Sequence, residues 1–439
     1  MKSGIANVRN ALRTGLMFAT MGSFLFGRSA ASDGVSPLRH RKGETTGAAQ
    51  KDSSASREPA FSIPVEPLGF YAPGPYYLGQ REALVSLDFL DEDRLLFTFR
   101  APGLVHRANT QETERQIRAK VLTLPQGVVE AEALWTLHDH DRYLWMLRDG
   151  HFLLRDENWI KEGDSKLELH PLLEFPGPLM SIEMDPEQKY LVTNSIEPSS
   201  VKAHTGQVSS PSSAEADITN DNQEASQKRD VVVRILDRAS GGVFLVSRVH
   251  APIHLPINDD GYIATLPGQN NEWVVSFDAF KGGSHLLGNV NSSCQPPVEF
   301  VTHDEAVVNT CLLQNGRRLI ALSITGKKLW EASAPATQIW PDLIISPDGS
   351  RIARETITVD HSIEDFGHAF NPQDVKGQLV EVFDAAGGKL LLQARVNPVL
   401  DGGGNVAISP SGNRVAILEA GAIEVYDLDV NPKSTASKP

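Results

Sequence analysis

Two short stretches of the chain share one order of apolar and polar positions. Residues 343–354 read LIISPDGSRIAR, and residues 406–417 read VAISPSGNRVAI. Each stretch passes from an apolar run through Ser-Pro and a polar Gly turn to an Arg and a second apolar run. Apolar positions that alternate on both sides of a short polar turn are typical of a β-hairpin. The sequence therefore predicts the same hairpin at these two places.

Five weaker copies of the hairpin lie earlier in the chain, at residues 86–99, 134–147, 181–194, 255–266 and 298–313. The turns of the seven copies are centred on Asp91, Asp139, Glu187, Asp259, Asp304, Asp348 and Ser411. Most of these turns are spaced by 44 to 48 residues, and the two longer intervals contain polar tracts at residues 197–230 and 359–377. A regular spacing of about 40–50 residues with β-structure in every unit is typical of propeller blades.

A second hairpin follows the first in most units, at residues 231–249, 272–290, 317–332 and 378–396, with a fainter copy at 118–135. Two hairpins give each unit four antiparallel strands, which we name a to d in chain order. The last unit ends after its third strand. The edge of this sheet would then carry backbone N–H and C=O groups without hydrogen-bond partners. We therefore expect residues 61–80 to supply the missing strand. The sequence thus predicts an all-β, seven-bladed β-propeller over residues 61–430, closed by an N-terminal strand.

Two of the repeated motifs resemble those of known propellers. SPDGSRIA and SPSGNRVA are similar to the repeats of WD-repeat-like propellers found in TolB-type and YVTN-type bacterial proteins. ALSITGKKLW, residues 321–330, also resembles the tryptophan-docking repeat of quinoprotein dehydrogenases. The resemblance covers roughly residues 83–430 and implies a propeller fold, but the matching motifs contain no catalytic residue.

The first residues have the composition of an export signal. Lys2, Arg9 and Arg13 precede a 12-residue apolar run at 15–26, and small residues follow it. That run is shorter than the roughly 20 residues needed to span a bilayer, so we expect a signal peptide over residues 1–31, with an uncleaved anchor as the alternative. We expect residues 32–60, 197–230 and 431–439 to be a disordered linker, insert and tail. The mature protein would then be secreted or periplasmic, without a membrane span.

Charge and loop placement limit the functions that we expect. The net charge of −14 argues against nucleic-acid binding, which requires a basic surface. The long segments at 101–116, 197–230 and 359–377 all fall between strands b and c, and therefore on one face of a propeller, which we call the b–c face. Long loops on a rigid scaffold often form binding sites. We predict a monomeric, non-catalytic scaffold that binds an unknown protein or small molecule through the b–c face.

Candidate catalytic and metal chemistry is sparse. No G-x-S-x-G, P-loop, H-E-x-x-H or dinucleotide motif occurs, and we predict no cofactor. Weak metal-ligand candidates are Asp360, His361, Glu364 and His368, which a solvated acidic loop explains equally well. The HDHD stretch at 138–141 is expected to be a turn.

The competing functional hypothesis is an exported propeller enzyme with an axial site, either a lactonase-like hydrolase or a quinone-linked dehydrogenase. Its residues would come one from each blade and would therefore be scattered along the sequence. A channel lined by His, Asp, Glu or Arg from several blades would favour the enzyme, whereas an apolar lining would favour the scaffold.

The chain has two cysteines, Cys294 and Cys311, and their spacing matches no metal or redox motif. In the predicted fold, Cys294 lies in the connection before the fifth blade and Cys311 near the end of that blade's second strand. Both positions face the b–c side, so a disulfide is feasible, and the sequence leaves its formation open.

Overall fold

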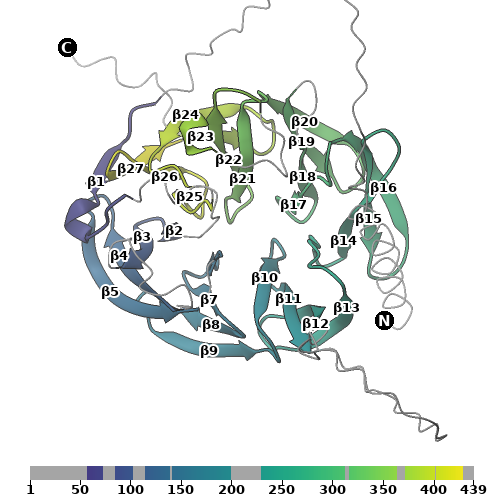
Figure 1. The fold of residues 1–439 in the computed structure, drawn as a ribbon, viewed down its shortest axis with the longest axis horizontal. Coiled ribbons are helices and arrows are strands. Elements are labelled where there is room, and N and C mark those ends of the chain that lie inside the picture. Colours follow the sequence, from purple (N-terminus) through teal and green to yellow (C-terminus); the bar gives the residue numbers. More distant parts are fainter. Residues whose placement is uncertain are drawn as a thin grey trace, which may run out of the picture.

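The computed structural model describes residues 57–72, 85–101, 114–138, 141–198, 229–311, 316–362, 371–400 and 402–428. In these ranges the chain forms seven small antiparallel sheets that stand around a common axis (Figure 1). The predicted seven-bladed β-propeller is confirmed. Helical structure in the described residues is confined to short segments such as η1 (Glu66–Leu68) and η3 (Pro372–Asp374), and none of these is long or apolar enough to cross a membrane.

Blades one to three each contain four consecutive strands in sequence order. The first blade comprises β2 (Val85–Asp91), β3 (Arg94–Ala101), β4 (Arg115–Thr123) and β5 (Val128–Leu137). The second comprises β6 (Leu144–Met146), β7 (Phe152–Asp156), β8 (Trp159–Gly163) and β9 (Leu169–Glu174). The third comprises β10 (Leu179–Met184), β11 (Tyr190–Pro198), β12 (Arg229–Asp237) and β13 (Val243–Val249).

The fourth blade comprises β14 (Gly261–Pro267), β15 (Glu272–Ala279) and β16 (Ser284–Asn291), with a bridge from Ile257 to Tyr262 at the inner position. The fifth comprises β17 (Val298–Phe300), β18 (Glu305–Asn309), β19 (Arg317–Ser323) and β20 (Lys328–Ala334). The sixth comprises β21 (Gln338–Ile345), β22 (Arg351–Val359), β23 (Val375–Asp384) and β24 (Leu390–Val396). The seventh comprises β25 (Val406–Ile408), β26 (Arg414–Glu419) and β27 (Ala422–Asp427).

The N-terminal strand β1 (Phe61–Pro64) completes the seventh blade by pairing with β27 (Figure 1). Ile63 lies opposite Ile423 in this antiparallel pair and is buried. The contact begins before the strand, because Arg57 Nη1 donates to the Asp427 carbonyl at 2.8 Å. The predicted closure of the ring by the N-terminal segment is therefore confirmed, and the two ends of the propeller are joined by backbone hydrogen bonds.

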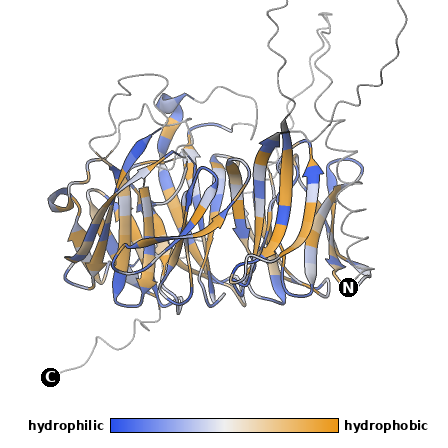
Figure 2. Ribbon diagram, turned by 90° about the horizontal axis from the view of Figure 1, so that it is seen from below, coloured by the Kyte–Doolittle hydropathy of each residue, from blue (hydrophilic) through white to orange (hydrophobic). Residues whose placement is uncertain are grey.

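Apolar side chains pack neighbouring blades against one another. Along the strands, hydrophobic residues alternate with hydrophilic ones (Figure 2). Trp330 of β20 illustrates the contact, since its indole nitrogen donates to the Ala385 carbonyl of the next blade at 2.5 Å. Its ring also stacks on Phe383, with 6.2 Å between the ring centres. Trp135, Trp145 and Trp273 are likewise part of apolar clusters that join neighbouring blades.

The hairpin predicted at residues 134–147 is wrong. Leu134 and Trp135 belong to β5, the outer strand of the first blade, whereas Leu144 begins the inner strand of the second blade. The turn between strands a and b of the second blade lies at residues 147–151 instead. The error has a simple cause: the end of an outer strand, a polar connection and the start of an inner strand reproduce the pattern of a hairpin.

The three long segments fall between strands b and c, as predicted. They connect β3 to β4, β11 to β12 and β22 to β23. Because the strands of every blade alternate in direction, these three connections leave and enter on the same face of the ring. Most of the residues in these segments, including 199–228, lie outside the described residues.

Candidate functional site

Two adjoining cavities lie on the propeller axis. The inner one has a volume of about 270 Å³ and is lined by the inner strands of six blades, including β2, β6, β21 and β25. The outer one has a volume of about 520 Å³ and is lined by residues at the b–c ends of the blades, such as Asn309, Thr310 and Trp340. Arg142, Asp342 and Gly402 line both cavities. Together the cavities form one passage, which we call the axial passage. Its outer end lies at the b–c face, and its inner end reaches the a–b turns at Gln188 and Pro347.

Carboxylates from three blades line the axial passage. Asp88 comes from β2, Glu299 from β17 and Asp342 from β21. Enclosure by the surrounding blades raises the pKa of Asp88 and of Asp342 above the ordinary value of Asp, although the Ser86 hydroxyl opposes the shift at Asp88 and Arg142 opposes it at both groups. Desolvation and the negative charge of Asp342 raise the pKa of Glu299 to about 7. The passage therefore gathers three carboxyl groups with raised pKa values together with the guanidinium groups of Arg142 and Arg317.

The charge of Arg142 lowers the pKa of all three carboxyl groups, and at Glu299 His254 has the larger lowering effect. Arg142 lies in the connection between the first and second blades. Its Nε donates to the Leu144 carbonyl at 3.1 Å, and its guanidinium lies 5.4 Å from the centre of the Trp145 ring. These contacts hold the guanidinium beside the wall of the passage.

Glu355 stands directly opposite Asp342 in the β21–β22 pair. The Glu355 side chain is buried, and no donor among the described residues reaches either of its carboxylate oxygens. Burial raises the pKa of Glu355 well above its ordinary value, and the charge of Asp342 adds to the shift. Two carboxylates at directly opposed positions repel each other, so this pair favours binding of a proton or another cation.

The local backbone places Asp342 in the passage. The register of β21 shifts between Ile339 and Asp342, and Trp340 adopts a left-handed conformation with φ of 47°. Such a bulge changes the direction in which the following side chains point. The chain also closes over the pair, since a Cβ at Gly403 would lie 2.7 Å from Asp342 Oδ2 and 3.9 Å from Glu355 Oε2.

His254 and Glu183 form an ion pair beside the passage. His254 Nδ1 lies 3.0 Å from Glu183 Oε2, and Nε2 donates to the Val298 carbonyl at 2.6 Å. Burial by itself would lower the pKa of His254, but Glu183 and the Val298 carbonyl together raise it to about 9. Both ring nitrogens are engaged, so the protonated His254 links the third blade to the fifth.

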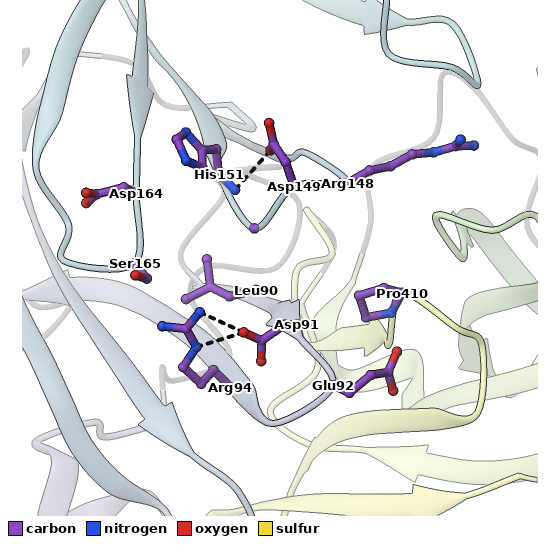
Figure 3. A pocket seen from close by; sticks show the side chains of 11 residues that line it. Leu90, Asp91, Glu92, Arg94, Arg148, Asp149, His151, Asp164, Ser165 and Pro410 are labelled. Carbon is purple, nitrogen blue, oxygen red and sulfur yellow. Dashed lines mark hydrogen bonds and ion pairs between the residues drawn. The ribbon is translucent and has the colours of Figure 1, made fainter.

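A separate cavity of about 420 Å³ lies on the opposite face, where the a–b turns of the first, second and seventh blades meet (Figure 3). Its polar groups have partners within their own turns or on a neighbouring blade. Arg94 Nη2 lies 2.7 Å from Asp91 Oδ2, and the His151 backbone N–H donates to Asp149 Oδ1 at 3.2 Å. The Ser411 backbone N–H of the seventh blade donates to Glu92 Oε1 at 2.7 Å. The charged groups of this a–b cavity are therefore largely paired.

The predicted metal-ligand residues are brought together in part. The ligand atoms of Asp360, His361 and Asp374 lie within 4.8 Å of one another. The two oxygens of Asp360 already bond to His361 Nδ1 at 2.7 Å and to Lys376 Nζ at 3.1 Å. Glu364 and His368 lie outside the described residues. Metal binding at this exposed loop stays a prediction.

Two further sequence candidates lie near the axial passage. Cys294 and Cys311 line the outer cavity with their sulfur atoms in bonding contact, and their Cα atoms are 5.6 Å apart, within the usual range of a disulfide. Their pairing in the mature protein stays a prediction. His138 of the HDHD stretch bonds through Nδ1 to Asp156 Oδ1 at 3.0 Å, whereas residues 139 and 140 lie outside the described residues.

The charged residues of the passage were not predicted from the sequence. Asp88 and Glu299 each interrupt an apolar strand, in VSLDFL and VEF. A charged residue inside a buried strand is uncommon, and this signal could have identified both. Glu355 carried no such signal, because it lies among polar residues in ARET. Arg142 carried no such signal, because the sequence placed it in a turn of the misassigned hairpin.

Comparisons with known proteins support the fold only. No protein-family model matches the chain, and no curated protein matches it. The C-terminal WD40 domain of Sif2 is similar at 12% identity over 80% of this chain and 97% of that chain, with a TM-score of 0.41. A TolB protein of Agrobacterium tumefaciens is similar at 11% identity over 68% of this chain and 94% of that chain, with a TM-score of 0.38.

An enzyme is also among the solved structures with a similar propeller. The acylaminoacyl peptidase of Pyrococcus horikoshii is similar at 9% identity over 85% of this chain, with a TM-score of 0.43. The chain spans about half the length of that peptidase, 55%. These likenesses concern the fold alone, and the propeller fold that the sequence resemblance implies is confirmed by the seven sheets themselves.

Proposed function

We propose that this protein is a non-catalytic β-propeller scaffold that binds a ligand in the axial passage through its b–c face. The observation that supports this proposal is the union of the two cavities at Arg142 and Asp342, which gives a passage from the axis to the b–c surface. The volumes of about 270 and 520 Å³ fall in the range of small-molecule sites. Charged groups from several blades converge there and can orient a ligand.

A thermal-shift screen of polar small molecules tests this proposal. A ligand of the axial passage should raise the melting temperature of the wild type but not that of Asp342→Asn, which alters the passage. Asp149→Asn is the matched control, because it makes the same charge change in the a–b cavity. If a ligand raises the melting temperature of Asp342→Asn but not that of Asp149→Asn, it binds on the opposite face. That result would overturn the proposal.

One observation favours a second candidate, an axial-site hydrolase. Convergent acidic and basic side chains line the channel, and Glu299 has a pKa of about 7, which suits a general base at neutral pH. This lining is the one expected of an enzyme rather than of a scaffold. We nevertheless rank this candidate second, because both nitrogens of His254, the imidazole beside the passage, are engaged in hydrogen bonds. Hydrolysis of a panel of lactones by the wild type, with loss of activity in Glu299→Gln, would favour the enzyme over the scaffold.

We also propose that the protein is exported, on the basis of the N-terminal basic and apolar pattern described above. Residues 1–56 lie outside the described residues, so this proposal rests on the sequence. N-terminal sequencing of the protein recovered from native cells should give a mature form that starts near Ser32. An intact Met1 in the soluble cell fraction would contradict export.

A further inference from the structure

The outer cavity of the axial passage is lined by charged groups of both signs. Its two carboxylates and two guanidinium groups belong to Asp141, Asp342, Arg142 and Arg317. Arg155 Nη2 lies 3.9 Å from Asp141 Oδ2, and Arg317 Nη1 donates to the Gln338 carbonyl. The formal charges of this lining cancel, so it favours neither a simple cation nor a simple anion.

Arg142 and Asp342 line both cavities, and both residues are exposed although the blades surround them. The charge of Arg142 lowers the pKa of Asp342, so the two groups are near enough to interact. Their described hydrogen bonds are nevertheless to backbone groups, because Arg142 Nε donates to the Leu144 carbonyl at 3.1 Å and Asp342 Oδ1 accepts from the Leu343 N–H at 3.0 Å. The junction of the cavities therefore presents a cation and an anion to the same space without an ion pair between them.

This pair of opposite charges limits the kind of ligand. A ligand with a single charge would pair with one of the two groups and leave the other without a partner in an enclosed site, which is unfavourable. A guanidinium group binds a carboxylate through two parallel hydrogen bonds, and a carboxylate accepts hydrogen bonds from an ammonium group. A molecule that carries both a carboxylate and an ammonium group can therefore pair with both Arg142 and Asp342.

The inner cavity continues from this junction and has room for an apolar group. Phe89 and Leu343 are among the apolar residues that line it. Its two carboxyl groups are partly compensated, since Asp88 accepts a hydrogen bond from the Ser86 hydroxyl at 2.6 Å and Glu299, with a pKa of about 7, is close to half protonated at neutral pH. An apolar group can therefore enter the inner cavity beside the charged junction.

From these observations we propose that the axial passage binds a free amino acid with a large apolar side chain. The carboxylate of the ligand pairs with Arg142, and its ammonium group pairs with Asp342. Both charged groups and the side chain leave one carbon atom of an α-amino acid, and the two charged residues and the apolar wall likewise meet at one junction of the passage. This inference rests on the proposed function and adds the chemical class of the ligand.

Isothermal titration calorimetry of the full chain at neutral pH tests the inference with three related probes. L-phenylalanine carries both charges, phenethylamine carries the ammonium group alone, and 3-phenylpropionate carries the carboxylate alone. L-phenylalanine should bind about tenfold or more tightly than either analogue, because each analogue lacks one charge-assisted pair. Glycine should bind more weakly than L-phenylalanine, since it has no side chain for the inner cavity.

Two variants separate the roles of the charged residues. Asp342→Asn should weaken the binding of L-phenylalanine and phenethylamine by about tenfold or more and spare that of 3-phenylpropionate. Arg142→Met should weaken the binding of L-phenylalanine and 3-phenylpropionate and spare that of phenethylamine. Asp149→Asn and Arg148→Met make the same charge changes in the a–b cavity and should bind all probes like the wild type. Far-UV circular dichroism shows whether each variant is folded.

Several outcomes would overturn the inference. Phenethylamine that binds as tightly as L-phenylalanine would assign the passage to a cation, and 3-phenylpropionate that does so would assign it to an anion. Equal binding of glycine and L-phenylalanine would remove the apolar side chain from the inference. Loss of binding in Asp149→Asn or Arg148→Met, with none in Asp342→Asn, would place the ligand on the opposite face and contradict the proposed function as well. If no amino acid binds but another compound passes the thermal-shift screen, this inference fails while the proposed function stands.

Discussion

Asp342 and Glu355 face each other across the β21–β22 pair, with the glycine backbone at residue 403 against both carboxylates. Opposed carboxylates destabilise a sheet when both are ionised. Asp342 is open to the axial passage, whereas Glu355 is buried behind it. The pair therefore couples the stability of the sixth blade to the protonation and ligand state of the passage.

The acidic groups of the passage should make the protein less stable as the pH rises. Burial raises the pKa of Glu299 from 4.5 to about 7 and that of Glu355 well above 4.5. The folded state therefore binds more protons than the unfolded state above pH 4.5, and the free energy of unfolding falls as the pH increases through this range. For Glu299 the loss should be nearly complete by about pH 8, about one unit above its folded pKa, and amount to about 3 kcal/mol.

Urea denaturation between about pH 4.5 and about pH 9.5 measures this effect. Glu355→Gln and Glu299→Gln should each flatten the decline, because an amide cannot ionise. A further decline between pH 6.5 and 9 should remain in both variants, since the raised pKa of His254 is stabilising only while the imidazole is protonated. Identical pH profiles for the wild type and Glu355→Gln would show that this carboxyl does not titrate with folding.

Closure of the ring by β1 should be essential for stability. Ile63 is buried opposite Ile423, whereas its neighbour Ser62 is exposed on the same strand. Ile63→Ala should lower the free energy of unfolding by about 2–5 kcal/mol, and Ser62→Ala should leave it nearly unchanged. Chemical denaturation of both variants makes the comparison. Equal stability of the two would mean that β1 is not held in the seventh blade.

Most of the fold could be predicted from the sequence because the blade signal is local and repeated. The hairpins at 343–354 and 406–417 each place apolar residues on both sides of a turn, and an error in one copy leaves the others intact. At residues 134–147 the predicted hairpin is wrong, because the outer strand of the first blade and the inner strand of the second are joined by a short polar connection that has the pattern of a turn. The passage could not be predicted in the same way, since Asp88, Glu299 and Asp342 are brought together only by ring closure.

The cysteine pair should stabilise the b–c face if it forms a disulfide. Cys294 and Cys311 are separated by 17 positions and have Cα atoms 5.6 Å apart. Closing a loop of this length should contribute roughly 3 kcal/mol. Cys294→Ser with Cys311→Ser should therefore lower the free energy of unfolding by about that amount in oxidising buffer. Non-reducing peptide mapping reports the bond directly, and two free thiols in the exported protein would refute it.

Two tryptophans provide a final, matched test of how the blades are held together. Trp330 and Trp135 are almost equally buried, at 8% and 6% exposed. Trp330 donates its indole hydrogen to the Ala385 carbonyl of the next blade at 2.5 Å. The indole nitrogen of Trp135 is buried and has no acceptor among the described residues. The two rings thus differ in hydrogen bonding while sharing a similar degree of burial.

Phenylalanine at either position keeps an aromatic ring and removes the N–H group. Trp330→Phe should lose stability through the smaller ring and leave the Ala385 carbonyl without its donor, whereas Trp135→Phe removes a donor that is already unsatisfied. The first variant should therefore be less stable than the second by about 1 kcal/mol or more. Thermal and urea unfolding of both proteins measure the difference, and equal losses would show that the Trp330–Ala385 hydrogen bond adds nothing to blade packing.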